Sequence, residues 1–191
     1  MDLIKSNKQW FLTGRIDILK HTIGSFKNLA MKYFLSLGSN IGDRKKNLNV
    51  ACSLLEKVHI KILRSSSIYE TQPVNYASQP WFLNQMLEVA AGQNPDELLD
   101  ILKKIEKKMG RKRSLPKGPR KIDIDIILAG EFIQQTPRLE IPHPQMQKRN
   151  FVLVPLREMA PGVVHPVLKK TIESLAREND DPSEIRKYQS E

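Results

Sequence analysis

The sequence feature that most limits the possible folds is the stretch GPRKIDIDIIL at residues 118–128. Isoleucine and aspartate alternate from Ile122 to Ile126, which is the two-residue period of a β-strand. Because successive side chains of a strand point to opposite faces, the isoleucines share one face and Asp123 and Asp125 share the other, roughly 6.5 to 7 Å apart at Cα. Aspartate disfavours strands and like charges repel, so a bound divalent cation is the simplest explanation. Ordinary ion pairs on an exposed polar face are the alternative.

The chain around this stretch alternates strands and helices. Strands are expected at residues 33–37, 60–69, 81–91 and 121–128, and helices at residues 43–58 and 94–109. Asp43 and Asn94 are suitable N-cap residues, and Pro95 suits the first position of the second helix. The order βαββαβ predicts a single α+β domain with a ferredoxin-like fold. Its two helices should cover one face of the sheet and leave the other face, with the aspartates, open to ligands.

Weaker patterns extend the domain toward the C-terminus. A hairpin partner is expected at residues 131–133, and a helix around residues 151–158, where Pro155 allows more than one start. These are additional C-terminal strand and helix elements of the predicted domain. Residues 179–191 are polar and are expected to form a fraying tail.

A chain of 191 residues fits one domain plus an extension. Residues 1–30 are interpreted as that extension, either disordered or the product of an upstream start, and a chain that begins at Met31 should keep its function. Cys52 is the only cysteine, which excludes an internal disulfide and a cysteine-based zinc site. It favours a reducing compartment, so we expect a cytoplasmic protein. The sequence contains no run of 18 apolar residues, so no membrane-spanning helix is expected.

The net charge of +10 favours anionic partners, namely nucleic acid, an anionic membrane or a polyphosphate, although a basic soluble surface is an equally good explanation. Cations gather directly before the aspartates, in residues 111–117 and at Arg120 and Lys121. Mg²⁺ takes one or two protein carboxylates plus substrate phosphates, and two such ions can clamp a phosphoryl displacement. The pattern predicts a site for Mg²⁺ and a polyphosphate. Neither a Walker A loop nor a G-x-G-x-x-G loop is present.

Four segments make the prediction specific. They are LSLGSNIGDRKKNL at 35–48, SSIYETQPVNYASQPWFLNQMLEV at 66–89, GRKRSLPKGPRKIDIDIILAG at 110–130 and IPHPQMQKRNFVLVPLREMAP at 141–161. Together they resemble the 6-hydroxymethyl-7,8-dihydropterin pyrophosphokinase family of folate biosynthesis. The resemblance implies a ferredoxin-like pyrophosphokinase domain at residues 31–178. It also implies transfer of diphosphate from ATP to the pterin hydroxymethyl group with release of AMP, by attack at the β-phosphorus assisted by two Mg²⁺ ions.

The resemblance further implies roles for individual residues. The residues at catalytic positions are Arg111, Arg120, Asp123 and Asp125, of which the two aspartates hold the metal ions. The residues at pterin-binding positions are Gly38, Thr71, Pro73, Val74, Phe82, Asn84 and Phe151. The residues at ATP-binding positions are Glu106, Arg113, Arg138, His143 and Arg149, with Lys117 as a further expected phosphate contact.

The chemistry of these residues suits such roles, but each also has a structural explanation. The rings of Phe82 and Phe151 suit a flat heterocycle, and Asn84 offers the donor and acceptor that a pterin amide edge needs. The alternatives are core packing for both rings and a backbone partner for Asn84. His143 could be structural, and Glu106 could pair with a loop arginine.

Lys117 is a departure from the family, whose members often carry tryptophan directly before Gly-Pro-Arg. The basic loop at residues 111–117 is also slightly short. Because this loop is a mobile lid in the family, closure and product release should differ in this chain. Residues 1–30 have no counterpart in the resemblance.

Two other functions remain open from the sequence. A basic βαββαβ sheet could bind RNA, although the aromatic RNP pattern is absent and Asp123 and Asp125 would repel RNA phosphates. A catalytically inactive homologue could act as an interaction domain, although the aspartates, Arg120 and both rings are present. We expect ATP and the pterin as partners, no nucleic acid, no membrane, and a monomer or weak homodimer.

Overall fold

The computed structural model describes residues 30–73, 79–110 and 118–189. The chain divides into two units, Met1–Ala30 and Met31–Glu191, and apart from Ala30 the described residues belong to the second. An antiparallel sheet forms its centre. The strands of this sheet are β1 (Met31–Ser39), β2 (Lys61–Ser65), β3 (Tyr69–Thr71), β4 (Phe82–Ala91), β5 (Asp123–Leu128) and β8 (Ile185–Lys187). Their order is β5-β1-β4-β3-β8, with β2 also paired with β4.

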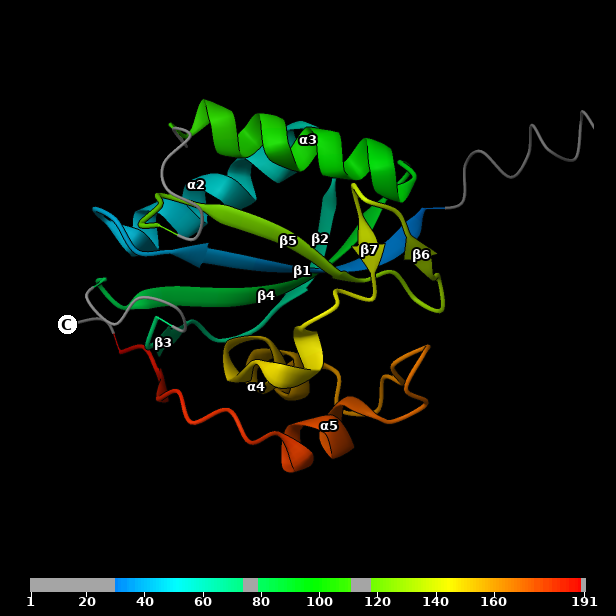
Figure 1. Ribbon diagram of the computed structural model, residues 1–191. Helices are drawn as coiled ribbons and strands as arrows, with labels where there is room; N and C mark the ends of the chain where they lie inside the picture. Colours follow the sequence, from blue (N-terminus) through cyan, green and yellow to red (C-terminus); the bar gives the residue numbers. More distant parts are fainter. Residues whose placement is uncertain (1–29, 74–78, 111–117, 190–191) are drawn as a thin grey trace, which may run out of the picture. The chain divides into compact units, whose positions relative to one another are not determined.

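The order of the elements confirms the predicted ferredoxin-like α+β fold. The helix α2 (Arg44–Lys57) connects β1 to β2, and α3 (Pro95–Lys108) connects β4 to β5. In the sheet, β1 lies between β4 and β5, which is the arrangement of a split βαβ fold. Both helices cover the same face of the sheet (Figure 1).

Both predicted N-caps are present. The Asp43 carboxylate accepts a hydrogen bond from Lys46 N at 2.9 Å. Asn94 accepts from Glu97 N at 3.0 Å, while the Glu97 carboxylate accepts from Asn94 N at 3.1 Å. These bonds satisfy donors that a helix start leaves without partners, and they fix where α2 and α3 begin. Among the described residues, no helix is long and apolar enough to cross a membrane.

The strand expected at residues 60–69 is instead two strands, β2 and β3, which both pair with β4. Ser66 lies between them. Its hydroxyl accepts a hydrogen bond from Met86 N at 2.9 Å and donates one to the Ser67 carbonyl at 2.7 Å. A side chain here takes the place of a backbone partner, so the strand is interrupted.

The isoleucine face of β5 is buried as predicted. Ile122, Ile124 and Ile126 belong to one core with the apolar residues of α2 and α3, including Leu55 and Leu102. Full burial of such a side chain contributes about 1.5–3 kcal/mol relative to exposure. This core fixes the orientation of β5 and therefore turns its aspartates to the opposite face.

The sequence predicts that the opposite face is open, but part of it is covered. Phe34, Met86 and Ile127 form a second core with α4 (Asn150–Met159) and α5 (Ile172–Glu178). Figure 1 shows these two helices on the side of the sheet away from α2 and α3. The expectation was wrong because apolar side chains on this face also need cover. The aspartate end of the face remains accessible.

Two short pairings also differ from expectation. The hairpin that follows β5 is formed by β6 (Gln134–Gln135) and β7 (Glu140–Ile141), rather than by residues 131–133. At the C-terminus, β8 pairs antiparallel with β3, so Ile185–Lys187 belongs to the sheet and does not fray.

Candidate active site

A cleft opens on the sheet face that carries the paired aspartates. It encloses about 620 Å³, including the part that is open to solvent, which lies within the usual range of small-molecule sites. The predicted pterin-binding residues that line it are Gly38, Thr71, Pro73, Phe82, Asn84 and Phe151. The predicted catalytic and ATP-binding residues that line it are Arg120, Asp123, Asp125 and Arg149. Residues of four strands, β1, β3, β4 and β5, and of α4 therefore meet in one cavity.

Asp123 and Asp125 face the cleft from β5, as the alternation predicted. The strand register places Asp123 beside Gly38 and Asp125 beside Ser36 on β1. Burial, and then the charge of Asp123, raise the pKa of Asp125 to about 6. The ionised pair is therefore held together at a cost in free energy, which a divalent cation would offset.

The donor set suits Mg²⁺. Among residues 30–73, 79–110 and 118–189, no group of three or more His, Cys, Asp and Glu side chains could hold a metal ion. Two carboxylates are what Mg²⁺ commonly takes from a protein, with phosphate oxygens and water completing its octahedral shell. Asp123 and Asp125 fit this pattern when a polyphosphate substrate shares the site.

Arg120 links the acidic and aromatic parts of the cleft. Its Nη2 lies 2.9 Å from Asp123 Oδ2, and its guanidinium carbon lies 5.6 Å from the centre of the Phe82 ring. Its Nε is buried and has no hydrogen-bond partner within the described part of the chain. A buried donor without a partner is costly, and a phosphate oxygen is a suitable acceptor.

Asn40 fixes the backbone of Arg120. Asn40 N donates to the Arg120 carbonyl at 3.1 Å, and Arg120 N donates to Asn40 Oδ1 at 2.7 Å. The Nδ2 of Asn40 also donates to the Pro80 carbonyl at 3.3 Å, two residues before Phe82. This buried amide therefore ties the end of β1 to the segments that carry Arg120 and Phe82. Sequence analysis gave Asn40 no role of its own beyond its place in the segment at residues 35–48.

Asn84 and Thr71 form the polar wall of the cleft. Asn84 Nδ2 donates to Thr71 Oγ1 at 2.7 Å, and both residues are buried. The bond orients the Asn84 amide and leaves its Oδ1 on the side of Gly38, where an added Cβ would meet it. The donor of Asn84 thus serves a hydroxyl group, not the backbone group considered from sequence.

Phe82 and Phe151 are both half-buried, so neither ring is simply part of a core. Phe151 packs against the edge of the second core and also lines the cleft. The Arg149 guanidinium carbon lies 5.5 Å from the centre of its ring, a cation–π distance. Each ring therefore keeps apolar surface in the cleft and has an arginine beside it.

Sequence reasoning missed three residues that line the cleft, namely Ser36, Gln72 and Gln79. Ser36 could have been found, because it lies two residues before Gly38 on β1 and therefore points to the same face of the sheet. Gln72 directly follows Thr71. For Gln79, we find no signal in the sequence.

Glu106, Arg138 and His143 do not line the cleft. Glu106 is 1 % exposed, and its carboxylate accepts a hydrogen bond from Ile124 N at 2.8 Å. It lies 3.1 Å from Lys103 Nζ in an ion pair. Arg138 forms an ion pair with an exposed aspartate of α3.

His143 lies close enough to the site to be affected by its charges. Burial, and then the charge of Arg149, lower the pKa of His143 to about 4, while the charge of Asp123 acts in the opposite direction. The imidazole is therefore neutral at pH 7. The remaining predicted site residues, Val74, Arg111, Arg113 and Lys117, lie outside the described residues.

The fold and the cleft define a class of protein, a ferredoxin-like α+β domain suited to hold a flat ring beside a polyanion. Sequence comparison gives the family. Residues 34–161 match the family model for 7,8-dihydro-6-hydroxymethylpterin-pyrophosphokinase (HPPK), and the chain belongs to this family.

Individual relatives agree. The chain is 40 % identical over 146 residues to the 2-amino-4-hydroxy-6-hydroxymethyldihydropteridine pyrophosphokinase of Aquifex aeolicus, a match that covers 76 % of this chain and 91 % of that protein. It is 44 % identical over 131 residues to the Bacillus subtilis protein of the same name, covering 68 % and 78 %. It is also 42 % identical over 134 residues to the folic acid synthesis protein fol1 of Schizosaccharomyces pombe, covering 70 % of this chain but only 18 % of that protein.

Solved structures show the same fold. A crystal structure of Plasmodium falciparum HPPK-DHPS A437G with STZ-DHP matches with a TM-score of 0.64 and 20 % sequence identity. The match covers 78 % of this chain and 45 % of that one. At this identity the likeness supports the fold alone.

Proposed function

We propose that this chain transfers diphosphate from ATP to the hydroxymethyl group of 6-hydroxymethyl-7,8-dihydropterin, a step of folate biosynthesis. The hydroxymethyl oxygen bonds to the β-phosphorus, the bond from that phosphorus to the oxygen bridging to the α-phosphorus breaks, AMP leaves, and the hydroxyl proton is released. The observation that carries the proposal is that one cleft contains both the paired aspartates and the ring-lined wall. The names of the Aquifex and Bacillus relatives support it.

The pterin is assigned to the part of the cleft formed by β1, β3, β4 and α4. Phe82 and Phe151 offer ring faces for a flat heterocycle. Asn84 Oδ1 accepts from a ring N–H, while one hydrogen of its Nδ2 is donated to Thr71 and the second is left for the ligand. These contacts orient the hydroxymethyl group toward the aspartates, and orientation of this kind supplies a large part of the barrier reduction in such a reaction.

The triphosphate is assigned to the part of the cleft formed by Arg120, Arg149 and the aspartates. The Arg120 guanidinium, whose Nε has no partner among the described residues, would donate to a phosphate oxygen, and Asp123 and Asp125 would hold two Mg²⁺ ions. The ions, when bound, would neutralise charge on the transferring phosphates. Glu106, Arg138 and His143 remain predictions as ATP contacts, as do Arg111, Arg113 and Lys117.

The test uses the purified full chain with ATP and 6-hydroxymethyl-7,8-dihydropterin, with and without Mg²⁺. We expect AMP and a diphosphorylated pterin in equal amounts, and only with the metal. Formation of ADP instead, or no product from folded protein, contradicts the proposal. In that case ATP and RNA titrations at several salt concentrations separate an inactive homologue from an RNA-binding module, because RNA binding weakens steeply with salt. A cytoplasmic location and a monomer or weak homodimer remain predictions.

A further inference from the structure

The C-terminal segment, residues 179–188, contacts both sides of the cleft. This segment follows α5 and lies beyond residues 34–161, the part of the chain that matches the family model. In Figure 1 it is drawn in red and runs from α5 to β3. Two separate groups of hydrogen bonds attach it, one at the start of α4 and one along β3.

At the start of α4, Asp181 caps the helix. Asn150 N donates to Asp181 Oδ2 at 2.8 Å, and Asn150 Nδ2 donates to the Asp181 carbonyl at 2.6 Å. The residue at the N-cap position of α4, Arg149, makes no side-chain cap of its own. An acidic side chain is favourable at a helix N-terminus, so Asp181 supplies the missing cap from outside the helix. The capped residue directly precedes Phe151.

The Asp181 carboxylate is itself held in place. Ser183 N donates to Asp181 Oδ1 at 2.9 Å, and Asp181 N donates to Asn179 Oδ1 at 3.2 Å. Asn179 Nδ2 also donates to Asn150 Oδ1 at 2.7 Å. The turn therefore presents its carboxylate to α4 in one orientation.

Along β3, the same segment forms strand β8. Thr71 pairs with Ile185, and the backbone N–H of Gln72 donates to the Glu184 carbonyl at 3.1 Å. The backbone N–H of Glu184 in turn donates to the side-chain oxygen Oε1 of Gln72 at 3.2 Å. Since Thr71 and Gln72 line the cleft, β8 stabilises the polar wall from behind.

Arg186 of β8 extends this support to Trp81, the residue before β4. Its Nη2 lies 2.7 Å from Glu70 Oε2, and its guanidinium carbon lies 5.0 Å from the centre of the Trp81 ring. Trp81 directly precedes Phe82. Arg44 binds the same two residues, through Glu70 Oε1 at 2.8 Å and the Trp81 carbonyl at 2.7 Å.

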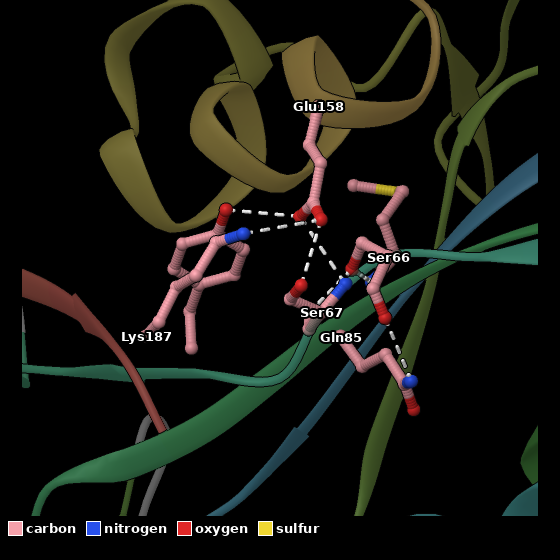
Figure 2. Close-up of polar contacts among 7 residues, drawn as sticks. Ser66, Ser67, Gln85, Glu158 and Lys187 are labelled. Atoms are coloured by element: carbon pink, nitrogen blue, oxygen red, sulfur yellow. Dashed lines mark hydrogen bonds and ion pairs between the residues drawn. The ribbon is translucent and has the colours of Figure 1, made fainter. Parts of the chain in front are cut away.

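Glu158 joins the far end of α4 to the same strands (Figure 2). Its carboxylate accepts hydrogen bonds from Ser67 Oγ at 2.7 Å and from the Tyr69 hydroxyl at 2.9 Å, and lies 3.5 Å from Lys187 Nζ. The start of α4 is thus attached to the C-terminal segment through Asp181, and its end is attached to Tyr69 of β3 and Lys187 of β8 through Glu158. The wall with Phe151 and the wall with Thr71 are thus coupled through the C-terminal segment.

We propose that residues 179–188 are a positioning segment that fixes the separation of these two walls and so sets the affinity for the pterin. The identity of the ligand rests on the proposed function. Asp181 acts on Phe151 through Asn150, and Arg186 acts on Thr71 through β8. Neither residue lines the cleft. Because Asn150 lies between Arg149 and Phe151, loss of Asp181 should affect the pterin more than ATP, and loss of Arg186, which lies farther from Arg149, should affect the pterin alone.

The first test compares Asp181→Ala with Asp180→Ala in the full chain. Asp180 is exposed and adjacent, so the control removes the same charge without removing the cap. We expect KM for the pterin to rise about tenfold in Asp181→Ala, the size of effect that loss of a helix cap can produce. KM for ATP should rise clearly less than KM for the pterin, because Arg149 also borders the cap, and the turnover number should stay within about twofold of the parent value. Asp181→Asn keeps only one of the two acceptor oxygens that Asn150 N and Ser183 N use, so it should restore part of the loss.

The second test compares Arg186→Glu with Arg177→Glu, an equal charge reversal on α5 at a side chain that is 75 % exposed. Arg186→Glu should repel Glu70 and release β8, raising KM for the pterin alone. Unchanged pterin KM in both Asp181→Ala and Arg186→Glu, or an equal rise in their controls, overturns the proposal. An equal rise in KM for ATP also overturns it, because that result indicates general loosening.

Amide hydrogen exchange gives a readout that does not depend on activity. Asp181→Ala should speed exchange at the start of α4, and Arg186→Glu should speed it in β3, with both controls unchanged. If the parent chain makes no AMP, the proposed function fails, and exchange still decides whether the segment holds the two walls. Unchanged exchange in both variants shows that it does not.

Discussion

A Cβ atom placed on Gly38 would lie 2.8 Å from Oδ1 of Asn84. Asn84 cannot turn away without breaking its hydrogen bond to Thr71, which is 2.7 Å long and buried. Gly38 is therefore required for space and not for an unusual backbone angle. The glycine of the first strand and the Asn84 amide that lines the cleft form one unit.

Gly38→Ala should displace the Asn84 amide and raise KM for the pterin by about tenfold or more, since overpacking of this kind costs about 1–3 kcal/mol. The matched control is Gly92→Ala, because nothing lies within 4 Å of a Cβ at that position. Steady-state kinetics with each substrate varied in turn measures the effect. If Gly38→Ala binds the pterin as the parent does, Asn84 is not a pterin contact.

Asp125→Asn tests the metal assignment. Asparagine fits the same space and removes one of two neighbouring, partly buried like charges, so the variant should fold. If the proposed assignment holds, loss of a charged group that binds the metal should lower turnover by roughly 10² to 10³. Asp100→Asn, at an exposed side chain of α3, should have no such effect. Product formation at varied Mg²⁺ is the measurement, and a variant with full Mg²⁺-dependent activity contradicts the assignment.

Phe151→Ala should weaken pterin binding much more than ATP binding. The ring lines the cleft, and truncation of a partly buried aromatic residue in a binding site typically costs at least about 1 kcal/mol. Phe132→Ala is the control, because Phe132 is 37 % exposed and lies on the segment before β6. Calorimetric titration with each ligand separates the two affinities. Equal losses of affinity for both ligands, or no loss, would contradict the assignment of Phe151 as a pterin contact.

Much of the fold follows from short-range patterns. The alternation at Ile122–Ile126 predicts the orientation of β5, and Asp43 and Asn94 predict the helix starts, because each feature is set by residues close together in the chain. With the family resemblance, such patterns also predict most residues that line the cleft. These patterns do not predict the long-range contacts that hold the cleft residues in place.

The missed features depend on contacts between residues far apart. The Asn40–Arg120 pair spans 80 positions, and the Asn150–Asp181 pair spans 31. The break between β2 and β3 depends on a serine hydroxyl that meets Met86 across the sheet. Periodicity does not encode such bonds, since any serine or asparagine could form them once the chain is folded.

Glu106 provides a fourth prediction. The Ile124 N–H points away from β1 at the edge of the sheet, and the Glu106 carboxylate accepts it at 2.8 Å. Glu106→Ala leaves a buried donor without this acceptor, which should lower the free energy of unfolding by about 1–3 kcal/mol. Glu106→Gln retains an acceptor and should recover most of the loss. Urea unfolding measures both variants, and equal stability of Glu106→Ala and the parent would show that this bond does not support β5.

The contacts of Glu158 predict a pH dependence of stability. Burial acts to raise the pKa of Glu158, but hydrogen bonds from Ser67 and Tyr69 outweigh it and hold the pKa below its usual value of 4.5. Burial, with the same hydrogen bond, raises the pKa of Tyr69 to about 12. A carboxyl group with a lowered pKa stabilises the folded state fully above its unfolded pKa. That stabilisation is lost as the pH falls below 4.5 and through the folded pKa.

Glu158→Gln should therefore be less stable than the parent at pH 7, and the difference should shrink as the pH falls below about 4.5, the usual range of a glutamate. Urea unfolding at a series of pH values measures this convergence. Glu131→Gln changes an exposed glutamate that makes none of the Glu158 contacts. Its free energy of unfolding should differ from that of the parent by the same amount at every pH. A constant difference between Glu158→Gln and the parent at every pH would mean that the carboxylate charge does not join α4 to β3. The attachment would then rest on packing and neutral hydrogen bonds.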